Sequence, residues 1–209
     1  MVNLEQDASS NSQNVKMAFA TIKKGSKGDG YFAIFEIGTP FFISTNEFLQ
    51  HSLYDNQTLS EQEFLELKEK LQPKRCYKKA LEYLARREHS SKELYLKLYQ
   101  KGFSKEIINT QLNNLKDENS LSDKRFATQF IISRQRRNPE GPFMLTQRLV
   151  SKGVDSSLAK EVVDIYFEDQ ENLKTDIEKA INRLKNKDNL KEQLRKKGFT
   201  SYQIQQFLE

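Results

Sequence analysis

Cysteine, histidine and tryptophan are scarce in this 209-residue sequence, which has one Cys, two His and no Trp. The single Cys76 excludes an internal disulfide framework and fits a reducing cytosol. One Cys and two His cannot supply an ordinary zinc site, so we expect no metal and no cofactor. Cys76 and His89 could pair as nucleophile and base, but about 20 Å of helix would separate them. The carboxylates show no acid/base spacing, and we therefore expect no catalytic residues and no enzyme.

Long apolar runs are also missing. No stretch approaches the ~18 apolar residues that span a bilayer, and residues 1–15 lack the apolar core of a signal peptide. We expect a cytoplasmic protein with no membrane contact and a loose amino-terminal tail. Hydrophobic residues make up 36% and charged residues 30% of a sequence with eight Gly, which favours a soluble, mainly helical protein.

Charge is unevenly distributed along the chain. Residues 1–73 carry 6 basic and 10 acidic side chains, a net charge of −4, whereas residues 74–209 carry 28 basic and 19 acidic ones, a net charge of +9. A basic body behind an acidic front suggests an anionic partner for the body. The basic charge of residues 74–209 could equally well serve only to keep the protein soluble, and charge alone does not distinguish these two explanations.

The first part of the chain has strand character. The segments MAFATIKK, YFAIFEIG and FFIS are rich in β-formers and are separated by GSKGDG and by a turn at Thr39-Pro40. They predict a small antiparallel meander. GSKGDG lacks the Gly-Lys-Ser/Thr ending of a phosphate-binding loop, so we interpret it as a hairpin turn. A short helix is expected near Asn46–His51, and Ser60–Glu63 is a capping box that opens a helix ending near Pro73.

Beyond Pro73, one nine-residue pattern occurs three times. It reads LYLKLYQKG at 94–102, LTQRLVSKG at 145–153 and LKEQLRKKG at 190–198. Two Leu four residues apart lie on one helix face, and a Lys in the last turn suits the negative end of the helix dipole. A Gly just past the end adopts the left-handed conformation that closes a helix. The pattern predicts the same short helix in three copies.

Each copy lies between two further predicted helices. Apolar stripes with helical spacing precede the copies: Tyr77, Ala80, Leu81 and Leu84; Phe126, Ala127, Phe130 and Ile131; Ile177, Ala180, Ile181 and Leu184. A third helix is expected after each Gly, with N-caps at Ser104, Asp155 and Thr200 and apolar anchors at Leu112, Val163 and Leu208. Further capping boxes are expected at Ser90–Glu93, Thr175–Glu178 and Thr200–Gln203.

These patterns predict a mainly α protein made of tandem three-helix repeats, forming an elongated array with a small β-rich amino-terminal extension. The expected parts are a tail at 1–15, an extension at 16–73 and repeats at 74–121, 122–172 and 173–209. Each repeat is expected to bury one face against its neighbour.

Basic charge falls on the first and second helices of the repeats, whereas residues 155–171 hold six acids and one Lys. An acidic third helix would be repelled by phosphates, which argues against reading of the DNA groove by a helix-turn-helix motif. We predict non-specific contact with nucleic acid or an acidic protein surface. The cluster at 134–137 could instead be dipole-matched cations at a helix end. The candidate binding residues are Arg86, Arg87, Arg125, Arg134, Arg136, Arg137, Arg148, Lys152, Arg195, Lys196 and Lys197.

Three segments, ALEYLARREHSSKEL (80–94), LSDKRFATQFIISR (121–134) and GPFMLTQRLVSKGV (141–154), together resemble the RecX family of bacterial regulators of the RecA recombinase. The resemblance covers most of residues 77–169. It implies a monomer that lies in the groove of the RecA–single-stranded DNA filament and restrains its growth and ATP hydrolysis, with weak or indirect DNA contact. It also implies scaffold roles for Leu94, Leu98, Gly102, Phe126, Ala127, Leu149 and Gly153, and contact roles for Arg125 and Arg134. The alternative hypothesis is a general DNA-binding protein without a recombinase partner.

The sequence departs from the family pattern at three places. Asn119 stands where many relatives have a glycine, and we expect it to adopt the left-handed conformation. Leu121-Ser122-Asp123 keeps one of two usual acids, so capping there is expected to differ. Phe143-Met144 is more apolar than in relatives, which points to packing or protein contact in place of DNA contact.

Overall fold

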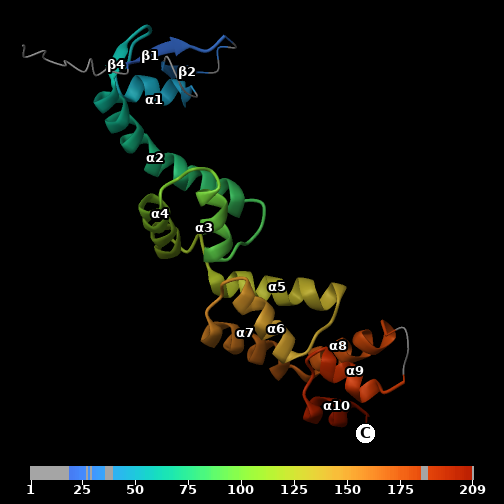
Figure 1. Ribbon diagram of the computed structural model, residues 1–209. Coiled ribbons are helices and arrows are strands. Elements are labelled where there is room, and N and C mark those ends of the chain that lie inside the picture. The colour runs from blue at the N-terminus through green and yellow to red at the C-terminus, as the bar shows by residue number, and fades with distance from the viewer. Residues whose placement is uncertain (1–18, 27, 29, 36–39, 185–187, 209) are drawn as a thin grey trace, which may run out of the picture. The chain divides into compact units, whose positions relative to one another are not determined.

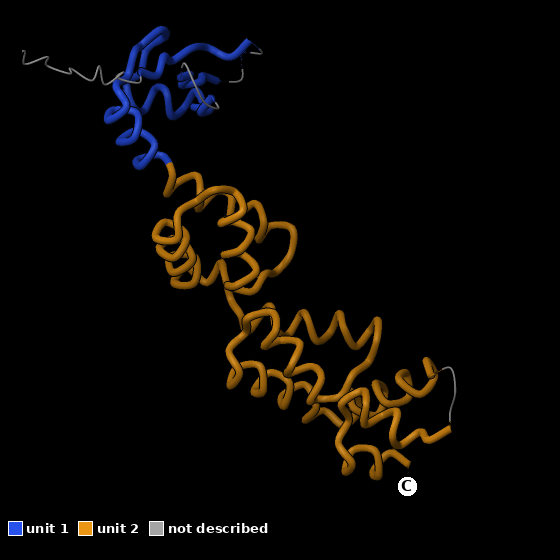
Figure 2. Tube along the Cα trace, in the orientation of Figure 1, with its two compact units in different colours: residues 1–71 blue, residues 72–209 orange. Residues whose placement is uncertain are grey.

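The structure is a computed structural model that describes residues 19–26, 28, 30–35, 40–184 and 188–208. The chain forms two compact units, residues 1–71 and residues 72–209 (Figure 2). The division falls within the long helix α2 (Glu61–Leu84). The expected loose tail lies outside the described residues.

Unit 1 contains a four-stranded antiparallel sheet, of which the β-rich segments predicted the first three strands and not the fourth. Its strands are β1 (Phe19–Lys24), β2 (Tyr31–Phe35), β3 (Phe41–Ile43) and β4 (Thr58–Ser60), in the order β3-β2-β1-β4. The GSKGDG hairpin between β1 and β2 is confirmed, since the Gly25 amide donates to the Gly30 carbonyl at 2.8 Å. A side chain at Gly30 would meet Phe42 and the Ile43 backbone, so the turn needs glycine there. The expected turn at Thr39-Pro40 lies partly outside the described residues.

Two capped helices follow in unit 1. Helix α1 (Thr45–Gln50) has a complete capping box between Ser44 and Glu47, and Ser60 and Glu63 form the predicted box at the start of α2. The expected helix end near Pro73 is wrong, because α2 continues through this residue. Proline removes one helical hydrogen bond, and burial of Leu71 before it and Cys76 after it offsets that loss.

Unit 2 is entirely helical in the residues described (Figure 1). After α2 its helices are α3 (Ser91–Tyr99), α4 (Lys105–Asp117), α5 (Asp123–Arg137), α6 (Pro142–Ser151), α7 (Ser156–Glu168), α8 (Gln170–Asn182), α9 (Leu190–Lys196) and α10 (Ser201–Leu208). They form three successive triplets, which we number repeat 1 (the end of α2 with α3 and α4), repeat 2 (α5–α7) and repeat 3 (α8–α10). The predicted class, mainly α with a small β-rich amino-terminal part, is confirmed.

The repeated nonamer forms α3, α6 and α9. Five of the six Leu at the two repeated positions are fully buried, namely Leu94, Leu98, Leu145, Leu149 and Leu194. The closing glycines Gly102, Gly153 and Gly198 have φ angles of +84°, +87° and +91°, as predicted for helix-ending glycines. Asn119 likewise has a φ of +57°, so the chain turns there as it would with glycine.

Four details of the repeat prediction are wrong. Helix α8 begins at Gln170 with Asp169 as its N-cap, so Thr175 lies inside the helix. Ser90 caps the amide of Glu93, but the Glu93 carboxylate binds Lys152 and Arg87 and does not complete the box. Leu208 is 40% exposed because α10 ends there, and Ile204 is buried in its place. Leu81 is 37% exposed, whereas Cys76, five residues earlier, is fully buried.

The apolar cores of unit 2 are distributed unequally. Repeat 1 has a core of its own, built from residues such as Cys76, Leu94 and Leu115. Repeats 2 and 3 share one core, in which Leu145 and Val163 of repeat 2 pack with Ile177 and Leu194 of repeat 3. The expected burial of one repeat against the next therefore holds for repeats 2 and 3, whereas repeats 1 and 2 meet through polar contacts.

Candidate polyanion-binding surface

Successive repeats are joined at corresponding main-chain carbonyls. The carboxyl-terminal end of α6 contacts the start of α3, and the carboxyl-terminal end of α9 contacts the start of α6 in the same way. In repeat 2 the Lys152 carbonyl accepts a hydrogen bond from the Ser90 hydroxyl at 2.7 Å, and in repeat 3 the Lys197 carbonyl accepts one from the Gly141 amide at 2.8 Å. The glycines beside these carbonyls lie against the preceding repeat, and a side chain at either position would overlap it.

The contact between repeats 1 and 2 engages three of the predicted binding residues. Arg125 Nε donates to Glu88 at 2.8 Å, and Lys152 and Arg87 both reach the Glu93 carboxylate at 3.0 Å. Burial would raise the pKa of Glu93, but the hydrogen bonds from Lys152 and Arg87 outweigh it and hold the pKa below its ordinary 4.5. These cations are thus partly neutralised within the protein.

Ser122 and Asp123 have separate roles at the start of α5. Ser122 is the N-cap of α5 and accepts from the Arg125 amide. The Asp123 carboxylate instead accepts from the Ser91 amide at 2.8 Å and the Ser91 hydroxyl at 2.7 Å. Asp123 therefore ties the start of α5 to the start of α3 in the preceding repeat.

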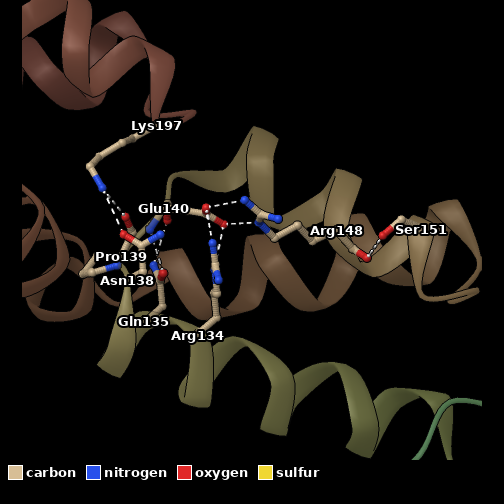
Figure 3. Close-up of polar contacts among 8 residues, drawn as sticks. All are labelled: Arg134, Gln135, Asn138, Pro139, Glu140, Arg148, Ser151 and Lys197. Atoms are coloured by element: carbon tan, nitrogen blue, oxygen red, sulfur yellow. Dashed lines mark hydrogen bonds and ion pairs between the residues drawn. The ribbon is translucent and has the colours of Figure 1, made fainter. Parts of the chain in front are cut away.

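Glu140 holds two more predicted binding residues in the loop between α5 and α6. Its side chain is 6% exposed and accepts paired hydrogen bonds from the guanidinium groups of Arg134 and Arg148, each reaching Oε1 at 2.6 Å (Figure 3). Burial would raise the pKa of Glu140, but the bonds from Arg148 and then Arg134 hold it below 4.5. Arg134 and Arg148 thus stabilise the loop, and the carboxylate offsets one of their two positive charges.

A second buried carboxylate lies next to this loop. Gln135 Nε2 donates to the Glu140 carbonyl at 2.8 Å and to Asp176 at 2.7 Å, and the Tyr166 hydroxyl donates to Asp176 at 2.9 Å. Asp176 is 1% exposed, and its burial raises its pKa above the ordinary 3.8 in spite of these two bonds. The network joins α5, α7 and α8, and sequence reasoning missed it because its members are single polar residues within apolar stripes.

The remaining cations of this region gather around the carboxyl-terminal end of α5. Arg136 and Arg137 are exposed, and neither has a carboxylate within ion-pair distance among the described residues. Arg183 of repeat 3 donates to the Arg136 carbonyl at 3.2 Å, and the Lys197 ammonium reaches Asn138 Oδ1 at 3.2 Å. We call these four residues the cationic corner: Arg136, Arg137, Arg183 and Lys197.

The cationic corner is well suited to anions. Burial lowers the pKa of Lys197, and the nearby Arg134 and Arg183 act in the same direction, although Glu140 opposes them. Arg136 and Arg137 are adjacent and exposed at the end of α5, and exposed neighbouring cations of this kind favour contact with a polyanion such as a phosphate backbone. Arg134, Arg136 and Arg137 all lie in the last turn of α5, which is the position that the alternative reading of this cluster as dipole-matched helix-end cations requires.

The predicted binding residues thus do not form one continuous surface. Arg136, Arg137 and Lys197 meet at the cationic corner, whereas Arg87, Arg125 and Lys152 lie at the contact between repeats 1 and 2. Arg134 and Arg148 flank Glu140. Arg86 and Arg195 are exposed elsewhere, and Lys196 pairs with Glu192 on α9 at 2.7 Å. Sequence reasoning missed Arg183, because acidic and basic residues alternate around it and it belongs to no basic cluster.

No catalytic arrangement emerges among the residues that the structure describes. Cys76 is fully buried, which raises the pKa of its thiol to about 11, and His89 is buried with Nδ1 2.9 Å from the Arg87 carbonyl. The described residues hold no group of three His, Cys, Asp or Glu side chains that could bind a metal ion. In the part of the chain that the structure describes, every helix is too short or too polar to span a lipid bilayer.

The fold and this surface define a class of tandem three-helix repeat proteins with cations at the joints between repeats. The models of the first and second RecX three-helix domains match residues 76–113 and 122–163, which fall in repeats 1 and 2. The chain belongs to the RecX family, as the resemblance of its sequence motifs implied.

Two relatives named regulatory protein RecX illustrate the similarity. The protein of Prosthecochloris aestuarii is 40% identical over 93 residues, which are 44% of this chain and 62% of that protein. The protein of Bacillus subtilis is 28% identical over 170 residues, which are 77% of this chain and 64% of that protein. The matches to these relatives span less than two thirds of their length.

Solved structures agree with the fold. The crystal structure of RecX from Lactobacillus salivarius matches with a TM-score of 0.56 and 27% identity, over 66% of this chain and 94% of that one. A second RecX crystal structure matches with a TM-score of 0.58 over 91% of this chain and 98% of that one, and its 18% identity supports the fold alone.

Proposed function

We propose that this protein is a non-enzymatic regulator that binds the RecA–single-stranded DNA filament and restrains its recombinase and ATPase activities. Membership of the RecX family supports a RecA partner. The observation that carries the mode of binding is the cationic corner, where Arg183 and Lys197 of repeat 3 contact the end of α5, which carries the exposed Arg136 and Arg137. Contact with a filament requires charge and shape, and it requires no bond chemistry.

The cationic corner supplies the polyanion contact in this proposal. Arg136 and Arg137 have no carboxylate partner among the described residues, so they can exchange their counterions for phosphates or filament carboxylates. Arg134 and Arg148 contribute indirectly, because they hold the Glu140 loop, which contacts Lys197 of the corner through Asn138 and Pro139. The proposal places the protein in the cytoplasm, together with the filament.

The proposal is tested by RecA-dependent ATP hydrolysis on single-stranded DNA, with the wild-type protein and with Arg136→Ala/Arg137→Ala. We expect inhibition by substoichiometric wild-type protein and about tenfold weaker inhibition by the variant. Lys105→Ala/Lys116→Ala is a matched control, because it removes two exposed cations from α4. Its inhibition should equal that of the wild type.

Two outcomes would count against the proposal. Inhibition only at amounts that coat the DNA would favour a general DNA-binding protein, particularly if naked duplex DNA bound as tightly as the filament. Equal loss in the α4 control would show that overall charge, and not the cationic corner, determines binding.

A further inference from the structure

The contact between repeats 1 and 2, which we call the polar joint, lacks the apolar core that repeats 2 and 3 share. Leu121 is the last residue along the chain in the core of repeat 1, and Phe126 is the first in the core of repeats 2 and 3. The two cores have no residue in common among those that the structure describes. Packed bodies move relative to one another unless a large apolar interface holds them, so the polar joint is the place in unit 2 where motion is expected.

Two ion pairs cross the polar joint. Arg125 Nε lies 2.8 Å from the Glu88 carboxylate, and Lys152 Nζ lies 3.0 Å from the Glu93 carboxylate. The side chains of Arg125 and Lys152 are 43% and 44% exposed. Ion pairs that water reaches in this way contribute little to stability and are weakened further by salt. The polar joint therefore depends on contacts that the solvent can break.

An open cavity lies at the same joint. It has a volume of about 750 Å³, and its lining includes Arg87 and Glu88 of repeat 1 and Phe126 and Phe130 of α5. Glu88 Oε2 is buried and has no hydrogen-bond partner among the described residues. A buried carboxylate oxygen without a donor costs free energy, which is recovered when water reaches it. Loose packing and this unsatisfied oxygen both lower the cost of opening the joint.

A fixed point remains where the chain crosses from repeat 1 to repeat 2. Asp123 follows Leu121 by two residues, and its carboxylate accepts from the Ser91 amide at 2.8 Å and from the Ser91 hydroxyl at 2.7 Å. These two bonds hold the start of α3 beside the start of α5. They lie next to the covalent connection between the repeats, so a rotation about this point can separate the ion pairs and leave both cores intact.

We propose that the polar joint is a hinge that the two crossing ion pairs hold closed. When these pairs are screened or removed, repeat 1 turns about the Ser91–Asp123 contact. Repeats 2 and 3 move as one body, because their shared core keeps its burial. Repeat 1 can thereby change its direction without unfolding any helix.

Double electron–electron resonance between two spin labels measures this motion in the full chain. Labels at Asn113→Cys and Asp164→Cys report the distance between repeats 1 and 2. Labels at Asp164→Cys and Gln206→Cys report the distance between repeats 2 and 3. All three sites are exposed, whereas the native Cys76 is fully buried and therefore protected from the labelling reagent.

The distance distribution between positions 113 and 164 should broaden about twofold when NaCl rises from about 50 mM to about 1 M. The distribution between positions 164 and 206 should keep its width over the same range. In the Arg125→Gln/Lys152→Gln variant, the first distribution should already be broad at low salt. Circular dichroism should show unchanged helix content, since neither substituted side chain belongs to an apolar core.

The matched control is Lys105→Gln/Lys160→Gln, which removes the same charge at exposed sites on α4 and α7. Its distribution between positions 113 and 164 should equal that of the wild type at both salt concentrations. Broadening in this control would overturn the proposal, because overall charge and not the crossing pairs would then close the joint.

Three further results would overturn the proposal. A first distribution that is narrow at both salt concentrations and in the Arg125→Gln/Lys152→Gln variant would show a rigid joint. One that is equally broad under all these conditions would show that the ion pairs do not hold the joint closed. Equal broadening between positions 164 and 206 would show that salt loosens the whole of unit 2. These measurements contain no RecA and no DNA, so their outcome is independent of the proposed function.

Discussion

Gly153 lies directly against Lys92 of the preceding repeat. A β-carbon at position 153 would overlap the Cβ of Lys92, which is fixed to the backbone of α3 and cannot move aside as the end of a side chain could. Gly102 has the same left-handed conformation, with a φ of +84°, but no atom lies within 4 Å of the position where its Cβ would stand. Both positions therefore require a left-handed backbone, and only position 153 also requires the absence of a side chain.

Gly153→Ala should therefore destabilise the protein more than Gly102→Ala. Left-handed backbone costs an alanine ~1–2 kcal/mol at either position. The overlap with Lys92 should add ~1–3 kcal/mol at position 153 alone. Urea unfolding measures the free energy of unfolding of each variant. Equal decreases would show that repeats 1 and 2 can move apart enough to remove the overlap at position 153.

Glu140→Gln tests the loop that supports the cationic corner. The substitution removes the charge that pairs with Arg134 and Arg148, and loss of one partner of a buried pair costs ~3–5 kcal/mol. We expect the lower end of this range, because the arginine side chains are 28% and 38% exposed. Arg136→Ala should change the free energy of unfolding by less than ~0.5 kcal/mol. A Glu140→Gln protein as stable as the wild type would show that the pairs contribute nothing net.

Asp176→Asn should raise stability at neutral pH. Burial raises the folded-state pKa of Asp176, so the folded state prefers the protonated form, and this preference becomes a cost as pH rises through that pKa. Asparagine keeps an oxygen that can accept from Gln135 and Tyr166 and carries no charge. The stability gain should be present at pH 7 and disappear as the pH falls below 3.8, the ordinary value for Asp. The free energy of unfolding of both proteins, measured between about pH 3 and pH 7, checks this prediction. A gain that does not vary with pH would contradict a raised pKa of Asp176.

Asp123→Ala tests the polar joint between repeats 1 and 2. It removes two hydrogen bonds to Ser91, and we expect a loss of ~1–3 kcal/mol. Amide hydrogen exchange should quicken at the start of α3, where the Ser91 amide loses its partner. Asp117→Ala on exposed α4 is the control, and its stability should match that of the wild type.

The helices and their ends could be predicted because their signals are local. The paired Leu, the closing Gly and the N-caps Ser104 and Asp155 depend on neighbours within one or two turns. Asn119 could be predicted for the same reason, since its short polar side chain tolerates the left-handed region. The start of α8 was misplaced at Thr175, because the helix begins at Gln170 and its additional turn buries Leu173.

The partners of the charged residues could not be predicted. A count of charges treats Arg134 and Arg136 alike, yet one binds Glu140 and the other is exposed. Lys152 meets Glu93 across 59 residues of sequence, a pairing that no periodicity reveals. For this reason the sequence located the basic segments and left open which cations remain available to a partner.

The repeated contact at Lys152 and Lys197 limits how such a chain can change its length during evolution. Each helix end that receives the preceding repeat requires a glycine and a carbonyl in the same place, so a partial insertion would leave a helix start with nothing to meet. Duplication or loss of a whole triplet preserves every joint. The glycine-to-glycine intervals of 51 and 45 residues, from Gly102 to Gly153 and on to Gly198, show that the segments around the joint can vary in length while the joint itself is kept.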